Sequence, residues 1–293
     1  MPGVLLVVNP QASAVTDELT ERVASALGPD ASVARTERPG HAVELARDAE
    51  AGAVVVFGGD GAFNEALNGL RSGVPLGLVP GGGSSVLPRA LGLPAGAEEA
   101  ARQVAEALRE GRTRTISLGR VNGRRFGFSA AFGFPAELVR RVDELGRERL
   151  GRRPPDRVFL TTALRMLGER RGRLDADVEV VGHGRAAFAV VSPGDPYTYL
   201  GRVPLRATPA ASWRGGLDLA APRTVGPLAI PRLLLAALTG RAPSTRGVLY
   251  LHDVEAVELR SQRPLPLQVD GEDLGDVELA TFAAEPKAAK ILL

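Results

Sequence analysis

Residues 53–69 read AVVVFGGDGAFNEALNG, a short apolar, β-branched run followed by a glycine-rich turn and a helical pattern. This order predicts a buried strand, a tight turn and a helix after Gly61. Backbone N–H groups at such a helix N-terminus bind phosphate. Asp60 would repel a phosphate by itself, so it fits this site if it binds Mg²⁺ or water beside the phosphate. The alternative is an ordinary turn in which Asp60 only caps the helix.

The same alternation of short apolar runs and amphipathic stretches continues to about residue 112. We expect strands at 4–8, 32–35, 53–57 and 76–79, and helices at 16–27, 41–50, after 61 and at 98–110. Strands that alternate with helices predict a doubly wound α/β domain with a mostly parallel sheet. Ligands bind such sheets at the carboxyl ends of the strands. The segments 9–13, 58–61 and 80–85 leave strands there, so we expect them to meet at one edge.

After about residue 112, strand-like runs follow one another without regular helices between them. They lie at 115–121, 125–131, 177–181, 186–191, 203–208, 217–220, 254–259, 265–269 and 277–282, with helices near 136–149, 156–168 and 227–239. This pattern predicts a mostly antiparallel, β-rich, sandwich-like C-terminal domain. We place the α/β domain at 1–115, completed by the segment 280–293, and the β-rich domain at 116–279.

The composition excludes several classes of protein. The chain of 293 residues has no cysteine, which excludes disulfides, thiolate nucleophiles and iron–sulfur clusters. No apolar stretch approaches the roughly twenty residues of a membrane-spanning helix, and a formal net charge of +2 does not indicate nucleic acid as a partner. The chain also begins in a predicted strand rather than in a signal peptide, so we expect a cytoplasmic protein.

The lysine content restricts how ATP could be bound. Lysine occurs only at Lys287 and Lys290, and nearly all other basic residues are arginine. P-loop and protein-kinase sites both place a lysine on the nucleotide phosphates, and neither can be built here. If the chain binds ATP, then backbone N–H groups, arginine and Mg²⁺ must neutralise the phosphates.

Four motifs together resemble the diacylglycerol kinase catalytic-domain family, the bacterial soluble lipid kinases related to sphingosine and ceramide kinases. They span nearly the whole chain: Asn9-Pro10, Gly58–Gly69 (GGDGAFNEALNG), Pro80–Pro94 (PGGGSSVLPRALGLP) and Gln268–Glu272 (QVDGE). NAD kinases, which are more distant relatives, share the GGDG turn. They lack the Asn-Glu and Asn-Gly pairs that follow it and the Arg89–Pro94 block, so we favour the lipid-kinase branch.

The resemblance implies a two-domain kinase with ATP in the cleft, the N-terminal loops on the nucleotide and the second domain on the lipid. Its cofactors would be ATP and Mg²⁺. The residues expected to contact the nucleotide are Asn9, Pro10, Gln11, Ala12, Ser13, Thr36, Gly58, Gly59, Asp60, Gly61, Ala62, Phe63, Asn64, Glu65, Gly82, Gly83 and Ser85. Some members bind a structural Mg²⁺ in an acidic loop, which reads Trp213-Arg214-Gly215-Gly216 here. That substitution leaves Asp218 as the one candidate ligand for a structural metal.

The candidate catalytic residues are Asp60, Asp270 and Glu272. Asp60 is the candidate ligand of the catalytic Mg²⁺, and Asp270 and Glu272 fall where the family places its catalytic carboxylates. Phosphoryl transfer to an alcohol needs a carboxylate near the hydroxyl and Mg²⁺ on the transferred phosphate. The turn Asp270-Gly271 after the run 265–269 would place both carboxylates at the end of a strand. Either could be the base, and a plain hairpin turn is the alternative.

Several positions depart from the family pattern. The usual threonine after GGDG is Ala62, the usual GTxN is Gly83-Ser84-Ser85, and an aspartate of many members is Pro135. Each lost hydrogen bond to a charged phosphate is worth about 1.5–3 kcal/mol, whereas backbone donors at a glycine turn do not depend on side chains. We expect an ATP- and Mg²⁺-dependent lipid kinase, with a diacylglycerol-like acceptor, in which these departures either weaken ATP binding or alter the acceptor. The alternatives are nucleotide or lipid binding without turnover, and an NAD kinase-like small-molecule kinase.

The acceptor side carries fewer signals. A lipid acceptor would require contact with a membrane surface, and so peripheral association with a membrane. The apolar stretch 228–238 (LAIPRLLLAAL) is too short to span a bilayer, so we expect it in the core or along an acyl pocket. The arginines between 140 and 173 form either a solvated helical face or a surface for anionic headgroups. An exposed sheet edge would permit a homodimer, and no motif identifies the acceptor lipid.

Overall fold

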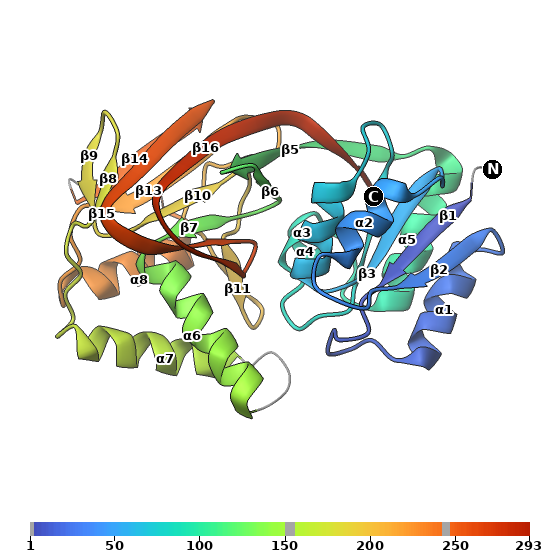
Figure 1. The fold of residues 1–293 in the computed structure, drawn as a ribbon, viewed down its shortest axis with the longest axis horizontal. Coiled ribbons are helices and arrows are strands. Elements are labelled where there is room, and N and C mark those ends of the chain that lie inside the picture. Colours follow the sequence, from blue (N-terminus) through green and yellow to red (C-terminus); the bar gives the residue numbers. More distant parts are fainter. Residues whose placement is uncertain (1–2, 150–155, 242–246) are drawn as a thin grey trace. The chain divides into compact units, whose positions relative to one another are not determined.

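The computed structural model describes residues 3–149, 156–241 and 247–293, and the chain divides into two compact units (Figure 1). One unit comprises the residues up to Leu118 together with Pro286–Leu293, and the other comprises Gly119–Glu285. β5 (Thr113–Val121) and β16 (Glu272–Leu292) each run from one unit into the other. The chain therefore passes between the units twice, both times along a strand.

The first unit is a parallel sheet covered by helices, with strand order β2-β1-β3-β4 and the end of β16 beside β4. Its elements are β1 (Val4–Val8), α1 (Asp17–Leu27), β2 (Ala31–Arg35), α2 (His41–Asp48), β3 (Ala53–Gly58), α3 (Asp60–Gly69), β4 (Leu76–Pro80), α4 (Val86–Ala90) and α5 (Ala97–Glu110). α1 packs on α5 and α2 on α3. Right-handed crossovers place these two pairs on opposite faces of the sheet, so every residue of β3 and β4 is buried. The predicted doubly wound α/β architecture is confirmed.

Gly69, at the end of α3, allows that helix to approach α2 closely. A Cβ atom at this position would lie 2.0 Å from the carbonyl oxygen of Val43 and 2.9 Å from its Cα atom. Real Cβ atoms do not come so close to backbone, so a larger residue would push the two helices apart. The glycine of the Asn68-Gly69 pair is therefore explained by helix packing.

We expect Gly69→Ala to lower the free energy of unfolding by about 2–3 kcal/mol, because α2 must move away from α3. Chemical denaturation followed by circular dichroism measures the change. Gly83→Ala is the matched control in the same unit, because a Cβ atom there would meet no atom within 4 Å. Equal stability of the two variants would contradict the close approach of the helices.

The second unit is built on an antiparallel sheet of order β14-β13-β10-β7-β15-β16. Its elements are β6 (Arg124–Phe126), β7 (Ala130–Phe132), α6 (Phe134–Arg149), α7 (Asp156–Glu169), β8 (Val178–Val180), β9 (Gly184–Ala186), β10 (Ala189–Ser192), β11 (Thr198–Leu200), β12 (Val203–Leu205), β13 (Leu217–Pro222), α8 (Ala229–Thr239), β14 (Val248–Val254) and β15 (Ala256–Val269). The long strand β15 pairs with β8 near its start and with β7 near its end. The core includes Phe126 and Phe282, whose rings meet edge to face with centroids 6.1 Å apart. The predicted antiparallel, β-rich C-terminal region is confirmed.

Three details differ from the sequence-based expectation. The run 125–131, expected as one strand, is divided by residues 127–129 into β6 and β7, and the run 186–191 is divided between β9 and β10. Most of β14 was not expected. The stretch 228–238 is not core, because none of the residues of α8 is buried. Its leucines lie on opposite sides of the helix, and a helix cannot bury both sides at the edge of a small unit.

Candidate active site

The loops that follow β1, β3 and β4 meet at one edge of the parallel sheet. The Asn9 N–H donates to the carbonyl oxygen of Phe57 over 2.9 Å, which links the first loop to the strand that precedes the second. The Gly81 N–H donates to the carbonyl oxygen of Gly58 over 2.7 Å, and the Ala14 N–H donates to that of Gly81 over 2.9 Å. We call this edge, formed by residues 9–14, 58–61 and 80–85, the glycine cradle.

Glycine is required inside the cradle at Gly82 but not at Gly83. A Cβ atom on Gly82 would lie 2.9 Å from the Cα atom of Gly59, so the two loops touch backbone to backbone. Gly83 is exposed, its Cβ atom would meet no atom within 4 Å, and its backbone is not left-handed. Neither packing nor conformation explains the glycine at position 83.

Asp60 is the first residue of α3, whose N-cap residue is Gly59, with no side-chain cap hydrogen bond. Gly59, and not Asp60, therefore occupies the N-cap position of α3. Asp60 is only 4% exposed, and its Oδ1 accepts a hydrogen bond from the Leu87 N–H of α4 over 3.4 Å. Its carboxylate thus lies between the start of α3 and the helix that follows the third loop of the cradle. A carboxylate oxygen in this position is a suitable ligand for Mg²⁺.

Glu65 and Asn64 contact the protein itself. The Glu65 carboxylate accepts hydrogen bonds from the Gly40 N–H over 2.8 Å and from the Ala42 N–H over 3.1 Å, at the N-terminus of α2. It therefore satisfies N–H groups that the helix cannot pair internally. The Asn68 side chain donates to the carbonyl oxygen of the fully buried Asn64 over 2.8 Å and to its Oδ1 over 3.2 Å. A nucleotide contact by either residue stays a prediction.

The other predicted nucleotide contacts lie on or beside the cradle. The Asn9 Oδ1 accepts the Gln11 N–H over 3.0 Å and orders the first loop. The Thr36 N–H donates to the carbonyl oxygen of Val8 over 2.8 Å, which places Thr36 at the end of β2 beside β1. Ser85 has a left-handed φ of 43°, and its hydroxyl donates to the carbonyl oxygen of Gly82 over 3.1 Å. Pro10, Gln11 and Ser13 are exposed, Ala12 is half-buried, and Ala62 and Phe63 are buried.

In the second unit, Asp270 binds residues 127–129, the segment that separates β6 from β7. Its carboxylate accepts the N–H groups of Gly127, Phe128 and Ser129 over 2.6, 2.9 and 3.1 Å. Its own N–H donates to the carbonyl oxygen of Ser129 over 2.8 Å, and the residue is only 3% exposed. The side chain thus turns back into its own unit and orders residues 127–129.

Trp213 contacts the same segment, for which the sequence predicts part of a continuous strand. The indole N–H donates to the carbonyl oxygen of Gly127 over 2.8 Å. The indole ring fills the space beside Gly194, where a Cβ atom would come within 2.1 Å of it. Gly127 within the apparent strand was the available signal for the break, since glycine inside a strand often marks an irregularity.

Glu272 and Asp218 have different surroundings. The Glu272 side chain is 33% exposed, and its Oε2 accepts a hydrogen bond from Arg124 over 2.9 Å. Asp218 is buried and accepts from the Tyr250 hydroxyl over 2.7 Å, the Asp253 N–H over 3.0 Å and the His252 ring over 2.9 Å. The hydrogen bond and charge of Asp218 raise the pKa of His252, and burial together with Asp218 raises the pKa of Tyr250. Within the described ranges, there is no group of three or more acidic or histidine side chains that could hold a metal ion.

Two adjoining cavities lie in the second unit, and Phe134 and Leu174 line both of them. The smaller one, of about 300 Å³, has almost entirely apolar walls, to which Ile230 and Leu233 of α8 contribute. The larger one, of about 990 Å³, is lined mainly by charged side chains. An apolar space beside a polar one suits an amphipathic molecule.

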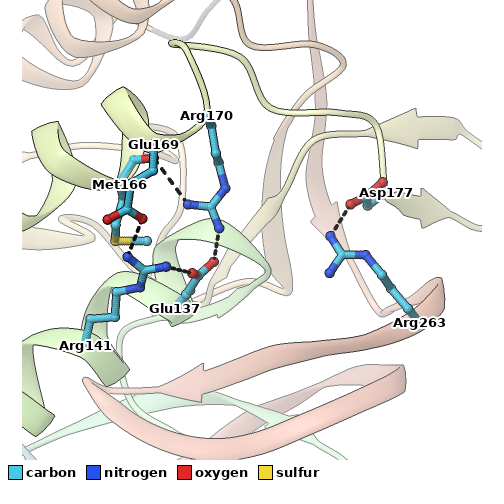
Figure 2. Close-up of polar contacts among 7 residues, drawn as sticks. All are labelled: Glu137, Arg141, Met166, Glu169, Arg170, Asp177 and Arg263. Carbon is cyan, nitrogen blue, oxygen red and sulfur yellow. Dashed lines mark hydrogen bonds and ion pairs between the residues drawn. The ribbon is translucent and has the colours of Figure 1, made fainter.

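Several arginines of the larger cavity pair with acidic side chains (Figure 2). Glu137 accepts from Arg141 over 2.7 Å and from Arg170 over 2.6 Å, and Arg141 also pairs with Glu169 over 2.7 Å. The view also shows Arg170 donating to the carbonyl oxygen of Met166 over 3.3 Å and Arg263 paired with Asp177. This part of the arginine-rich tract is therefore an ion-paired network. Arg152 and Arg153 of the tract, and the side chains of Arg147 and Arg149, lie outside the described residues.

In comparisons with known proteins, the first part of the chain matches a family model, and the chain as a whole matches the fold of solved structures. Residues 3–121 match the model of the family described as "Diacylglycerol kinase catalytic domain". The diacylglycerol kinase of Bacillus subtilis (strain 168) is 33% identical over 130 residues, which are 42% of this chain and 42% of that protein. The matched segments span half or less of the length of the curated relatives.

Two solved structures share the fold. The crystal structure of a diacylglycerol kinase from Bacillus anthracis str. Sterne superposes with a TM-score of 0.71 at 17% identity, over 99% of this chain and 96% of that one. An NAD kinase from Archaeoglobus fulgidus, solved in complex with ATP, gives a TM-score of 0.53 at 13% identity, over 99% and 93%. In the part of the chain that the structure describes, no helix has the length and apolar character needed to cross a bilayer.

Proposed function

Because residues 3–121 match the model of the diacylglycerol kinase catalytic-domain family, we propose that this chain is an ATP-dependent kinase of that family and phosphorylates a lipid hydroxyl. One observation carries the proposal: three backbone loops and a buried aspartate meet at a single edge of the parallel sheet. The first unit would bind the nucleotide and the second the lipid, which corresponds to the predicted domains 1–115 with 280–293 and 116–279.

The glycine cradle is the proposed phosphate site. Its backbone N–H groups would neutralise the phosphates, since a lysine is not available in any of the motifs. Mg²⁺ is usually held by one or two carboxylates together with substrate phosphates, and Asp60 would be its ligand from the protein. A bound Mg²⁺ would offset the charge of the transferred phosphate.

Glu272 is the proposed base, and Asp270 is proposed to position the segment 127–129. Three N–H groups already occupy the buried Asp270 carboxylate, whereas Glu272 is partly exposed. As the acceptor hydroxyl oxygen bonds to the γ-phosphorus, the bond from that phosphorus to ADP breaks, and the hydroxyl proton moves to Glu272. The apolar cavity beside α8 would hold part of the acyl chain, with a diacylglycerol-like lipid as the acceptor.

An assay with labelled ATP, Mg²⁺ and a panel of acceptors tests this function. The panel contains diacylglycerol, ceramide, sphingosine and NAD, and chromatography separates the labelled products. We expect label in the diacylglycerol product. Label in NAD would establish the small-molecule kinase alternative instead. If calorimetry shows binding of Mg²⁺–ATP but no labelled product forms, the chain is a binding protein without turnover. This alternative is favoured by Ala62, which replaces the threonine usual at that position.

Gly83→Ala is expected to weaken Mg²⁺–ATP binding about tenfold and to leave the free energy of unfolding within about 0.5 kcal/mol of the wild type. The added methyl group meets nothing in the protein, so only a ligand that approaches the backbone would sense it. Calorimetry measures the affinity, and denaturation measures the stability. Unchanged affinity would show that the phosphates do not approach this loop.

A further inference from the structure

The helix α8 has two apolar sides, and only one of them is explained by the cavity. Ile230, Leu233, Ala236 and Ala237 lie on the side that lines the apolar cavity. The opposite side carries Leu234, Leu235 and Leu238, which are 49, 61 and 40% exposed, and Leu228 just before the helix is 80% exposed. We call these four leucines the outer face of α8. Such a cluster on a surface marks contact with a membrane or another protein.

Only positive charge surrounds the outer face in sequence. No aspartate or glutamate occurs between Asp218 and Asp253. Among the described residues of that stretch, three arginines are exposed: Arg223 precedes the helix, Arg232 lies within it and Arg241 follows its C-terminus. Leucines beside arginines, without acidic residues, are typical of helices that lie in the interface of an anionic bilayer.

We propose that the outer face of α8 docks this protein onto bilayers that contain anionic phospholipids. The leucines would enter the acyl-chain boundary, while the arginines would stay at the level of the headgroup phosphates. A second copy of the chain fits less well. A two-fold contact would bring the same face of both copies together and would place arginines near arginines.

Docking in this way would also place a wall of the acceptor cavity at the membrane, because the inner side of α8 lines that cavity. An acceptor lipid would then have a short path from the bilayer to the cavity. This consequence rests on the proposed kinase function, whereas the docking itself does not.

Vesicle flotation with the full chain tests the docking, without ATP or acceptor. The vesicles contain either phosphatidylglycerol with phosphatidylcholine or phosphatidylcholine alone. The double variant Leu234→Ser/Leu235→Ser is expected to bind the anionic vesicles at least about tenfold more weakly, which corresponds to about 1.4 kcal/mol. Arg232→Gln and Arg241→Gln are each expected to weaken that binding about fivefold. Leu279→Ser is the matched control, because Leu279 is 45% exposed on β16 of the same unit.

Unchanged vesicle affinity of the leucine double variant, with the melting temperature of the wild type, would overturn the docking proposal. Failure of the wild-type chain to bind either type of vesicle would do the same. Loss of a dimer in size-exclusion chromatography, with vesicle binding intact, would assign the outer face to self-association instead.

A kinase assay separates this inference from the proposed function. The double variant should keep its rate on a detergent-dispersed acceptor and lose rate on vesicles. If vesicle binding depends on α8 but the chain phosphorylates no lipid, the proposed kinase function is refuted and the docking proposal is supported. If the chain phosphorylates a lipid but its vesicle binding does not depend on α8, the docking proposal is refuted and the kinase function is supported.

Discussion

Replacing Asp270 with alanine is expected to lower the free energy of unfolding by about 3–5 kcal/mol and to abolish phosphoryl transfer. The carboxylate accepts three backbone N–H groups from residues 127–129, at a position that is 3% exposed. Alanine would leave these donors without an acceptor, and each unsatisfied buried group costs about 1–3 kcal/mol. Asp270 also has a left-handed φ of 49°, which aspartate tolerates better than alanine.

Urea denaturation measures the stability, and the labelled-ATP assay measures the activity. Asp270→Asn keeps one acceptor oxygen and is expected to lose less stability than the alanine variant. Asp273→Ala is the control, because the Asp273 carboxylate is more exposed and pairs with Arg140, so its loss should cost at most about 1 kcal/mol. Equal stability of Asp270→Ala and Asp273→Ala would refute the positioning role of Asp270.

Asp60→Asn is expected to reduce kcat at least about 100-fold while the protein stays folded. Asparagine has the same size and can still accept the Leu87 N–H with its side-chain oxygen. It lacks the negative charge that would attract Mg²⁺ to the phosphates. The Mg²⁺ concentration that gives half-maximal activity should therefore rise as well, which a titration of Mg²⁺ in the kinase assay measures.

Asp17→Asn is the matched control for this variant. Asp17 also lies in the first turn of a helix of the first unit, but its side chain is 80% exposed and pairs with Arg35 at the surface. Its replacement should change neither kcat nor the Mg²⁺ requirement. An Asp60→Asn enzyme with wild-type values of both would show that Asp60 is not a metal ligand.

The first unit was the easier part to predict because its pattern is local. Parallel strands covered on both faces appear in the sequence as continuous apolar runs, and the expected ranges 4–8, 53–57 and 76–79 differ from β1, β3 and β4 by at most one residue at an end. The loops at the ends of three such strands, two of them rich in glycine, were sufficient to predict the cradle, since parallel strands all end at the same edge.

The second unit was harder because its strands are short and pair with distant parts of the chain. Residues 127–129 look like strand, and only the carboxylate of Asp270, far along the sequence, shows why they leave the sheet. The leucines of α8 likewise indicate an apolar helix. Which of them face a cavity and which face solvent depends on the sheet beneath the helix.

Sequence alone determined the parallel fold, the glycine cradle and the presence of Asp60 within it, because strand order and helix starts follow from local periodicity and turn residues. Tertiary structure decided what the motif residues contact. Glu65 binds the start of α2, Gly69 allows two helices to touch, and Asp270 holds three backbone N–H groups. A side chain finds its partner only when the chain has folded, since a hydrogen bond or a close contact depends on distance in space and not on spacing in sequence.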